Sequence, residues 1–401
     1  MELKKYKLGE ILELQRGYDL PSSKMENGSV PVAGSNGIIG YHNVAKIQPP
    51  CLTIGRSGSV GKVHFYEEPI WPHNTSLYVK DFKGNDERYV YYLLKNIDLS
   101  KLCDSSVVPS LNRNYVYPLE VFFYCDKINQ RRIASVLSSL DSKIALNRRI
   151  NTKLETIAKR LYDYWFVQFD FPDANGNPYK SSGGKMVWND ALKREIPEGW
   201  EVKRLGEVCE CDLSGDWGES DIKGNHNYKV NCIRGCDMVD MTNLPTRYIL
   251  PSNAKKILKN GDFVIEISGG SPTQSTGRIV QITDEILNRF NGKVICSNFC
   301  HGIRLIDKTY NSYFIQMWNM FYRNGVFFNF EGKTSGLKNF QFDTFFAQSW
   351  HFPPKNLVQQ YHQLFSDIKL KIDRNATETA RLTALRDKLL PLLMNGQVEV
   401  A

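Results

Sequence analysis

The stretch that decides the fold is Asp126–Phe166, which reads DKINQRRIASVLSSLDSKIALNRRINTKLETIAKRLYDYWF. It holds no Pro or Gly in 41 residues, and its large aliphatic side chains recur at heptad-like spacing, which predicts one long helix. Asp126 is the expected N-cap, because its carboxylate can accept from free backbone N–H groups of the first turn. At a rise of 1.5 Å per residue the helix is about 60 Å long, and its narrow apolar seam requires a partner helix.

The expected partner lies in the same chain, at Asn356–Gly396. An offset of 228 carries aliphatic positions of the first helix onto aliphatic positions of the second, and it carries Asn147 onto Asn375. A polar residue in such a seam lowers stability but fixes the register. The expected helix-pair seam comprises Ile133, Val136, Leu140, Asn147, Ile150, Leu154, Ile157 and Leu161, and then Leu364, Ile368, Asn375, Leu382, Leu385 and Leu389.

The segments before the two helices also repeat. YKLGEILELQRG at Tyr6–Gly17 returns as VKRLGEVCECDLSG at Val202–Gly215, and later motifs recur in the same order while the offset grows from 197 to 228. Short β-branched runs between Gly, Asn and Pro predict strands and tight turns there. The predicted fold class is α+β, with two mixed α/β domains separated by two long antiparallel helices and related by an internal pseudo-twofold repeat. The expected segments are a first domain (1–125), a central helix (126–166), a connector loop (167–200), a second domain (201–354) and a C-terminal helix (355–396).

Composition fits a globular protein of two or three domains. Of the 401 residues, 42% are hydrophobic, and no apolar run approaches 18 residues. Because the amino end does not read as a signal peptide and the nine cysteines have no scaffold spacing, we expect a cytoplasmic protein with reduced thiols. The net charge is +8, and 126–166 alone carries +5 (9 basic minus 4 acidic residues), which points to a polyanionic partner.

Several stretches together resemble a known family, the DNA-specificity (S) subunits of type I restriction–modification systems. They are the KLGEI and RLGEV openings, GSNGIIGYHN, IGRSGSVGKV, the central helix, and NPYKSSGGKMVWNDALKREIPEGWEVKRLGEV. The resemblance implies a non-catalytic subunit whose two target-recognition domains each read one half of a bipartite double-stranded DNA target, with the spacer set by the helix pair. It also implies docking of two modification (methyltransferase) subunits, which bind S-adenosylmethionine and methylate adenine, and of restriction subunits, which move and cut DNA. No cofactor is expected in this chain.

Base recognition needs donors and acceptors aimed at base edges, so the candidates are polar side chains in the Gly-rich loops. In the first domain they are Ser35, Asn36, Tyr41, Asn43, Arg56, Ser57, Ser59, Lys62, His73, Asn74, Thr75, Ser110, Asn112, Arg113 and Asn114. In the second they are Trp217, Arg234, Ser268, Ser271, Gln274, Ser275, Thr276, Arg278, Ser297, Asn298, Lys333, Thr334, Ser335, Lys338 and Asn339. Gly55, Gly58 and Gly61 would let the backbone approach a duplex closely. The alternative is ordinary turn chemistry, since Asn and Ser favour tight turns without any ligand.

No catalytic or metal-binding residue is predicted. The chain lacks the Asn/Asp-Pro-Pro-aromatic motif that an adenine methyltransferase needs. Asp262 and Glu266 are spaced like the acidic residues of a nuclease strand, but Ser268 occupies the position where such a strand would carry its catalytic Lys. The pairs Cys232/Cys236 and Cys296/Cys300 depart from the usual zinc-knuckle spacing. Two alternatives stay open: a stand-alone DNA-modifying or DNA-cleaving enzyme with a cryptic site, and a coiled-coil interaction protein without a DNA role.

Overall fold

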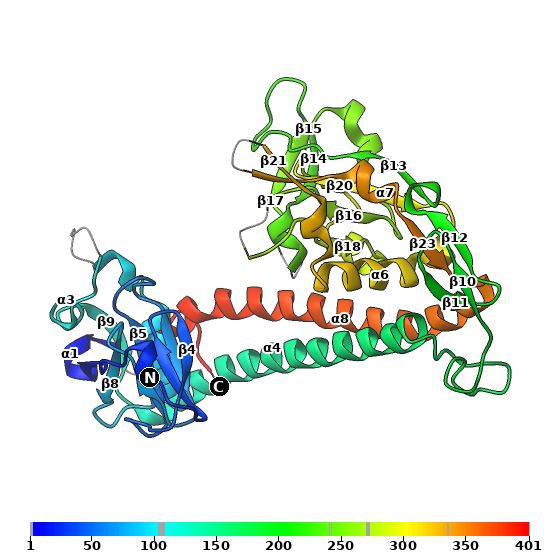
Figure 1. Ribbon diagram of the computed structural model, residues 1–401. Coiled ribbons are helices and arrows are strands. Elements are labelled where there is room, and N and C mark those ends of the chain that lie inside the picture. Colours follow the sequence, from blue (N-terminus) through cyan, green and yellow to red (C-terminus); the bar gives the residue numbers. More distant parts are fainter. Residues whose placement is uncertain are drawn as a thin grey trace. The chain divides into compact units, whose positions relative to one another are not determined.

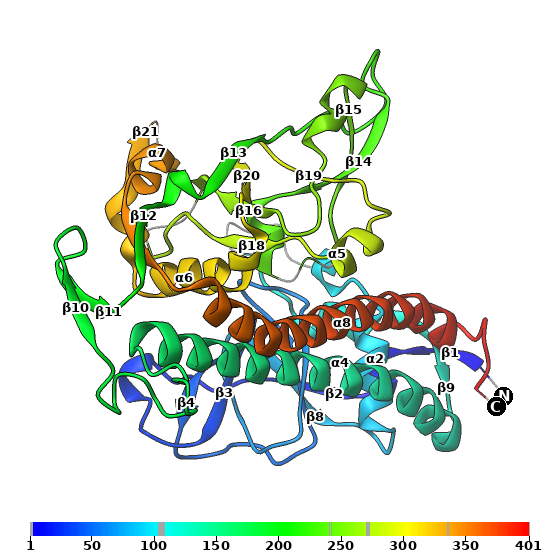
Figure 2. The ribbon, with the colours of Figure 1, turned by 90° about the vertical axis from the view of Figure 1, so that its right-hand side faces the viewer.

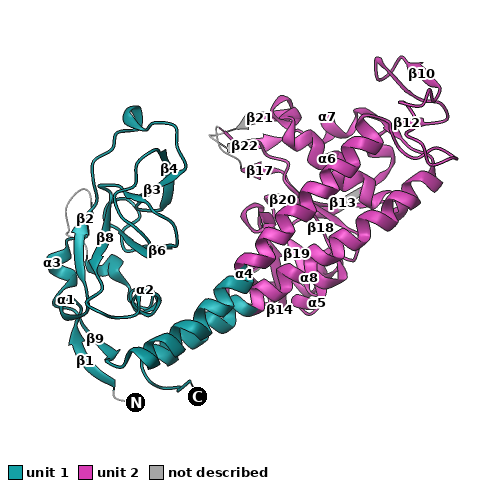
Figure 3. Ribbon diagram, turned by 90° about the horizontal axis from the view of Figure 1, so that it is seen from below, with its two compact units in different colours: residues 1–144, 382–401 teal, residues 145–381 magenta. Residues whose placement is uncertain are grey.

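The computed structural model describes residues 3–102, 109–239, 241, 243–269, 273–334 and 337–400. The chain forms two compact units, residues 1–144 with 382–401 (unit 1) and residues 145–381 (unit 2) (Figure 3). The predicted fold class is confirmed, because strands and short helices in each unit accompany two long helices, α4 and α8 (Figure 1). The division into units differs from the expected five segments, since each unit takes part of both long helices. Among the described residues, no helix is both long enough and apolar enough to cross a membrane.

The long helices begin and end close to where the sequence predicts. Helix α4 spans Lys127–Tyr162 and continues into a π-helical turn at Asp163–Val167, while α8 spans Lys355–Met394. The expected cap is confirmed, because the Asp126 carboxylate accepts from the backbone N–H of Ile128 at 3.0 Å. At 1.5 Å per residue, the 36 residues of α4 extend about 54 Å.

The two helices pair antiparallel within each unit, as the views in Figures 1 and 2 agree. In unit 1, Arg386 Nη1 of α8 lies 2.7 Å from Asp141 Oδ1 of α4. In unit 2, Asn147 Nδ2 donates to Glu378 Oε2 at 2.8 Å, and the Tyr162 and Tyr361 rings meet with centroids 6.4 Å apart. Residues later in α4 therefore contact residues earlier in α8, as expected for two antiparallel helices.

Most positions of the expected seam are at least partly buried, and three are exposed. Ile157, Leu364 and Leu385 are exposed, with 52%, 50% and 43% of their surface accessible. Ala158 is buried in place of Ile157, and one residue along a helix turns the side chain by about 100°. The buried members of the expected seam are Ile133, Asn147 and Asn375, and the partly buried ones are Val136, Leu140, Ile150, Leu154, Leu161, Ile368, Leu382 and Leu389.

The globular part of unit 1 is built on two small sheets and one strand pair. Its strands are β1 (Leu3–Lys7), β2 (Glu13–Arg16), β3 (Val30–Gly34), β4 (Gly37–His42), β5 (Cys51–Gly55), β6 (Val63–Tyr66), β7 (Trp71–Pro72), β8 (Ser76–Asp81) and β9 (Glu120–Tyr124). They form the sheets β2-β8-β5-β6 and β4-β3-β7 and the pair β1-β9. Helices α1 (Leu8–Ile11), α2 (Glu87–Lys95) and α3 (Arg113–Val116) join them. The apolar core includes Leu8, Leu52, Tyr89, Leu137 and Leu393, so both long helices contribute to it.

Unit 2 repeats this topology and adds to it. Its strands are β10 (Met186–Asn189), β11 (Arg194–Pro197), β12 (Glu201–Arg204), β13 (Cys209–Ser214), β14 (Tyr228–Ile233), β15 (Thr246–Ile249), β16 (Phe263–Glu266), β17 (Ser268–Gly269), β18 (Ile279–Gln281), β19 (Val294–Cys296), β20 (Cys300–Leu305), β21 (Glu331–Thr334), β22 (Leu337–Phe340) and β23 (Ser349–Phe352). Its short helices are α5 (Asp284–Arg289), α6 (Asn311–Arg323) and α7 (Phe342–Phe346). An aromatic core around Tyr162, Phe166, Tyr313 and Tyr361 joins α4, α6 and α8.

The internal repeat is confirmed strand by strand. The sheet β13-β20-β16-β18 matches β2-β8-β5-β6, the sheet β15-β14-β19 matches β4-β3-β7, and the pair β12-β23 matches β1-β9. Even the exceptional parallel pairs correspond, β3 with β7 and β14 with β19. Within the described ranges, the second copy adds the sheet β17-β22-β21 and helix α5.

The connector at 167–200 is more ordered than the sequence predicts. It contains the antiparallel hairpin β10-β11, and Phe169, Phe171 and Trp200 are buried in the core of unit 2. The loop expectation was wrong because Gly, Asn and Pro mark the turns of this segment, while its aromatic residues supply enough apolar surface to fix it.

Candidate nucleic-acid interface

The strand order of unit 1 brings several polar loops to one edge of its main sheet. Strands β2 and β5 are both antiparallel to β8, which lies between them, so they end where β8 begins. Arg16 ends β2, Arg56 follows β5, and Thr75 precedes β8. We call this edge, with loops 35–36, 56–62, 73–75 and 110–113, the first loop edge.

Hydrogen bonds tie these loops together. The Arg56 N–H donates to Thr75 O at 2.8 Å, and the Leu111 N–H donates to Arg56 O at 2.8 Å. Lys62 Nζ donates to Asn36 Oδ1 at 2.7 Å, which fixes the tip of the β3-β4 hairpin against the loop after β5. Loops far apart in the sequence therefore form one surface.

Glycine is required where these loops approach one another. A Cβ on Gly55 would lie 2.0 Å from Ser59 O and 2.7 Å from Ser35 O, so no side chain fits. Gly58 and Gly61 have φ of 82° and 79°, in the region that favours glycine. In unit 1, these glycines therefore close the loops onto each other.

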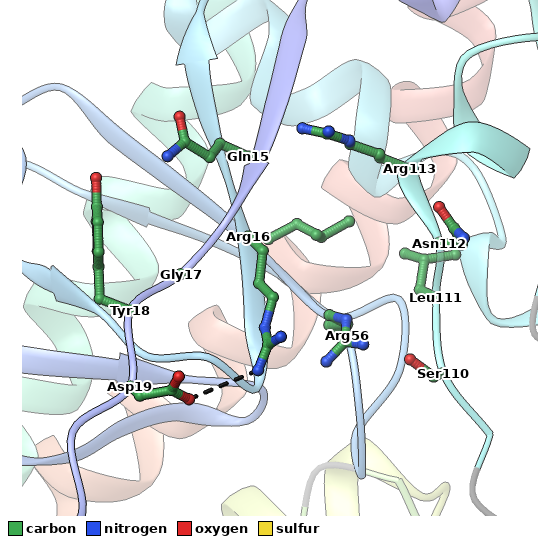
Figure 4. Close-up of a pocket in the computed structure, with 11 residues that line it drawn as sticks. Gln15, Arg16, Gly17, Tyr18, Asp19, Arg56, Ser110, Leu111, Asn112 and Arg113 are labelled. Atoms are coloured by element: carbon green, nitrogen blue, oxygen red, sulfur yellow. Dashed lines mark ion pairs between the residues drawn. The ribbon is translucent and has the colours of Figure 1, made fainter.

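A pocket of about 820 Å³ opens at the first loop edge (Figure 4). Four predicted residues line it, Arg56, Ser110, Asn112 and Arg113. The candidates named from the sequence do not include Gln15, Arg16, Tyr18 and Asp19, which also line the pocket. Strand β2 carries Gln15 and Arg16 to the edge, and Tyr18 and Asp19 follow that strand. Three guanidinium groups against the single carboxylate of Asp19 favour an anionic ligand.

The other predicted residues of the first domain divide into edge and framework positions. Ser57, Ser59, His73 and Asn74 belong to the edge loops, and Ser57 forms an isolated β-bridge with Ser110. Three side chains serve the fold: His73 Nδ1 lies 2.9 Å from Thr75 Oγ1, Asn74 donates to Asp19, and Asn112 accepts from the Asn114 N–H at 3.0 Å. Tyr41 and Asn43 lie at the opposite end of β4 from its turn, where Asn43 donates to Glu26.

Unit 2 has an edge of the same construction. Strands β13 and β16 are both antiparallel to β20, so they end where β20 begins. Trp217 comes after β13, Ser268 comes after β16 and Asn298 comes before β20, which places all three at the same edge of the sheet. We call this edge, with loops 215–217, 234–237, 267–269, 273–278 and 297–299, the second loop edge. Asn298 and Phe299 are exposed there. The Arg247 guanidinium stacks on the Trp217 ring, with its Cζ 3.7 Å from the ring centroid.

Most cations of the second loop edge are paired with carboxylates. Arg278 forms two bonds to Glu266, at 2.8 and 2.5 Å, and Arg234 forms a similar pair with Asp237 at 2.9 and 2.8 Å. The Asp237 pairing raises the pKa of Arg234 above its ordinary range. Lys338, from the neighbouring strand β22, lies 2.9 Å from Glu331.

Several predicted residues of the second domain serve the framework. Ser275, Thr276 and Ser297 are buried, and Thr276 donates its N–H and hydroxyl to Glu331. Their burial argues against base contacts. Gln274 donates to Tyr322 at 3.2 Å, and the backbones of Ser268 and Asn339 pair between β17 and β22. Ser271 and Ser335 lie outside the described residues, and Lys333 and Thr334 are placed only as backbone of β21.

The acidic strand and the cysteines have structural partners. Asp262 receives two bonds of 2.7 Å from Arg304, so both acids of the possible nuclease strand are held in buried ion pairs with arginine. Burial raises the pKa of Cys232 and of Cys300 to about 12, which keeps these thiols protonated. Unlike the loop edges, these groups are enclosed in the core of unit 2.

Comparisons with known proteins agree with this architecture. The family model described as "Type I restriction modification DNA specificity domain" matches residues 1–156 and 197–384. The chain is 26% identical over 355 residues to the type I restriction enzyme MjaIX specificity subunit of Methanocaldococcus jannaschii, covering 85% of this chain and 76% of that one. It is 24% identical over 312 residues to the HindI specificity subunit of Haemophilus influenzae, covering 68% of each.

A solved structure shares the fold. The S subunit of a type I restriction–modification system from M. genitalium superposes with a TM-score of 0.65 at 16% identity, over 98% of this chain and 96% of that one. The repeated sheets, the two long helices and a family model that covers both repeats lead to one conclusion. The chain belongs to the family of type I restriction–modification DNA-specificity subunits.

Proposed function

We propose that this specificity subunit reads a bipartite DNA target, with one half-site at each loop edge and the spacer set by α4 and α8. The observation that carries this proposal is the repeated order of strands in the two units, which presents the same kind of edge twice in one chain. A split-site reader needs two modules at a fixed separation of about one turn of DNA, ~34 Å. A continuous helix of about 54 Å that begins in one unit and ends in the other is suited to fix that separation.

The proposal includes a division of labour. The chain recognises double-stranded DNA and docks two modification subunits, which bind S-adenosylmethionine and transfer the methyl group, and restriction subunits complete the assembly. The absent methyltransferase motif and the arginine-paired acids Asp262 and Glu266 support a non-catalytic role. Methyl transfer or DNA cleavage by the purified chain alone would contradict it.

A domain exchange tests the modular part of the proposal. Residues 1–125 are replaced by the first domain of another specificity subunit, joined just before Asp126 so that the helix cap is kept. Sequencing of methylated sites in a host that expresses the chain with its modification subunits should show one altered half-site, with the other half-site and the spacer unchanged. If both halves change, the two edges do not read DNA independently.

A further inference from the structure

One arginine of the two loop edges has a free guanidinium group. Two arginines of the first loop edge have partners: Arg113 Nη1 donates to Leu14 O at 3.0 Å, and Arg16 Nη2 lies 3.5 Å from Asp19 Oδ1. The arginines of the second loop edge, Arg234 and Arg278, are paired with carboxylates, as described above. Among the residues that the structure describes, the Arg56 side chain has no hydrogen-bond or ion-pair partner.

The backbone of Arg56 is held firmly while its side chain lines the pocket. Its N–H donates to Thr75 O and its C=O accepts from the Leu111 N–H, both at 2.8 Å. The next residue, Ser57, also donates to Thr75 O, at 3.2 Å. Figure 4 shows Arg56 among the residues that line this pocket, together with Ser110 and Gln15. Three backbone hydrogen bonds to the neighbouring loops 73–75 and 110–113 therefore fix the point from which the Arg56 side chain extends.

The same three bonds recur in the second repeat around Ile267. The Ile267 N–H donates to Phe299 O at 3.0 Å, the Ser268 N–H donates to the same oxygen at 3.2 Å, and the Phe340 N–H donates to Ile267 O at 2.8 Å. Position 56 of the first repeat and position 267 of the second are thus structurally equivalent. The repeat keeps the frame and changes the side chain, from a free cation to an apolar residue packed against the core.

We propose that Arg56 determines specificity by donating two hydrogen bonds to a guanine in the half-site read by the first loop edge. This inference rests on the proposed function. A planar fork of donors matches O6 and N7 of guanine, and this is the commonest specific arginine contact with DNA. A phosphate contact needs only a charge at the surface, whereas the Arg56 side chain extends from a backbone held by three hydrogen bonds and lines a pocket together with Ser110 and Asn112. The equivalent Ile267 makes no such contact.

The test uses the complex of this chain with its modification subunits and a panel of duplexes in which each base pair of the first half-site is changed in turn. The domain exchange identifies which half-site that is. Wild-type complex should prefer a G·C pair at one position by about 5- to 150-fold, the equivalent of 1–3 kcal/mol. Arg56→Gln should abolish the preference at that position alone. Arg56→Lys should also relax it, because an ammonium group keeps the charge but loses the fork.

Arg88→Gln is the matched control. Arg88 carries the same charge in the same unit, but it pairs with Glu67, just after the end of β6 that lies away from the first loop edge. This variant should keep the wild-type target, and the melting temperature of each variant should stay close to wild type.

Three results would overturn the inference while leaving the proposed function intact. They are an unchanged target for Arg56→Gln, a half-site made only of A·T pairs, and a uniform loss of affinity with a smaller salt dependence, which marks a phosphate contact. The proposed function fails separately, if the wild-type complex methylates no bipartite sequence.

Discussion

His351 is a buried imidazole whose protonation can be measured through stability. It is 1% exposed in β23, its ring packs on Trp350 with centroids 4.6 Å apart, and its Nδ1 lies 3.2 Å from the Tyr313 hydroxyl. Burial, helped by the nearby Arg194, lowers the pKa of His351 to about 3. In an unfolded chain the pKa is about 6.5, so the folded state binds fewer protons between these values. Its contribution to stability is complete above pH 6.5 and decreases as the pH falls toward 3.

We therefore expect His351→Phe to flatten the acid dependence of stability. Phe keeps the ring contacts and cannot take up a proton. Between pH 7 and pH 5, wild-type protein should lose up to about 2 kcal/mol more of unfolding free energy than the variant. Denaturant unfolding followed by tryptophan fluorescence measures this, with His362→Gln at an exposed position of α8 as the control. Equal acid dependence in His351→Phe and wild type would show that His351 does not govern it.

Arg56 and Arg278 show how far the role of a single side chain can be predicted from the sequence. Both were predicted from similar Gly-rich, polar loops, yet Arg278 is held by Glu266, whereas the Arg56 side chain has no partner within the described part of the chain. Glu266 and Arg278 are twelve residues apart in the sequence, and only the register of β16 against β18 brings them together. Residue type and loop context predicted which segments gather at an edge, whereas pairing across strands decides which side chains remain available.

At the scale of elements, the helices were predicted well because periodicity reports directly on burial. The absence of Pro and Gly and the cap at Asp126 set the start of α4 within one residue. The seam was off at Ile157, Leu364 and Leu385 because the heptad rule assumes a single partner. In both units α4 and α8 also pack on the domain core, so Tyr162 and Tyr361 in unit 2, and Leu137 and Leu390 in unit 1, enter the buried face.

The polar layer of the helix pair allows a test at this scale. Asn375 Nδ2 donates to Asn151 Oδ1 at 2.8 Å, and Asn151 donates to Ile372 O at 3.0 Å, inside a mostly apolar contact. Asn375→Leu leaves the Asn151 amide short of a partner, which should cost about 1–3 kcal/mol. The double change Asn151→Leu/Asn375→Leu removes both polar groups and should recover most of that loss. Urea unfolding of wild type, both single variants (Asn151→Leu and Asn375→Leu) and the double variant measures the coupling. A double variant as unstable as the sum of the single changes would show that the two amides act independently.

At the scale of the whole molecule, the internal repeat was readable from sequence because matched helices keep a constant offset. The growth of the offset correctly placed extra structure in the second copy, but not its form as β17-β22-β21 and α5. Loop insertions obey no periodicity, so the sequence offers no rule for their strand pairing. The periodic helices therefore match between the two copies, whereas the loop edges differ in charge. The first edge has Arg56 where the second has Ile267, and the arginines of the second edge are paired with carboxylates.

The spacer role of α4 and α8 leads to a prediction about the DNA target. Four residues are inserted into each helix at the boundary between the units, after Ile144 and after Arg381. The pair Asp141–Arg386 lies on one side of this boundary and Asn147–Glu378 on the other, so matched insertions preserve the pairing on both sides. Four helical residues add about 6 Å and a rotation of about 40°. One base pair adds about 3.4 Å and about 34°.

The methylated sequence should therefore keep both half-sites and gain one or two base pairs of spacer. Two base pairs match the added length, and one matches the added rotation more closely. The same insertion in α4 alone is the control. It shifts one helix against the other and exposes apolar seam residues, so we expect loss of methylation rather than a longer spacer. An altered half-site with an unchanged spacer would mean that the loop edges, and not the helices, set the distance between the halves of the target.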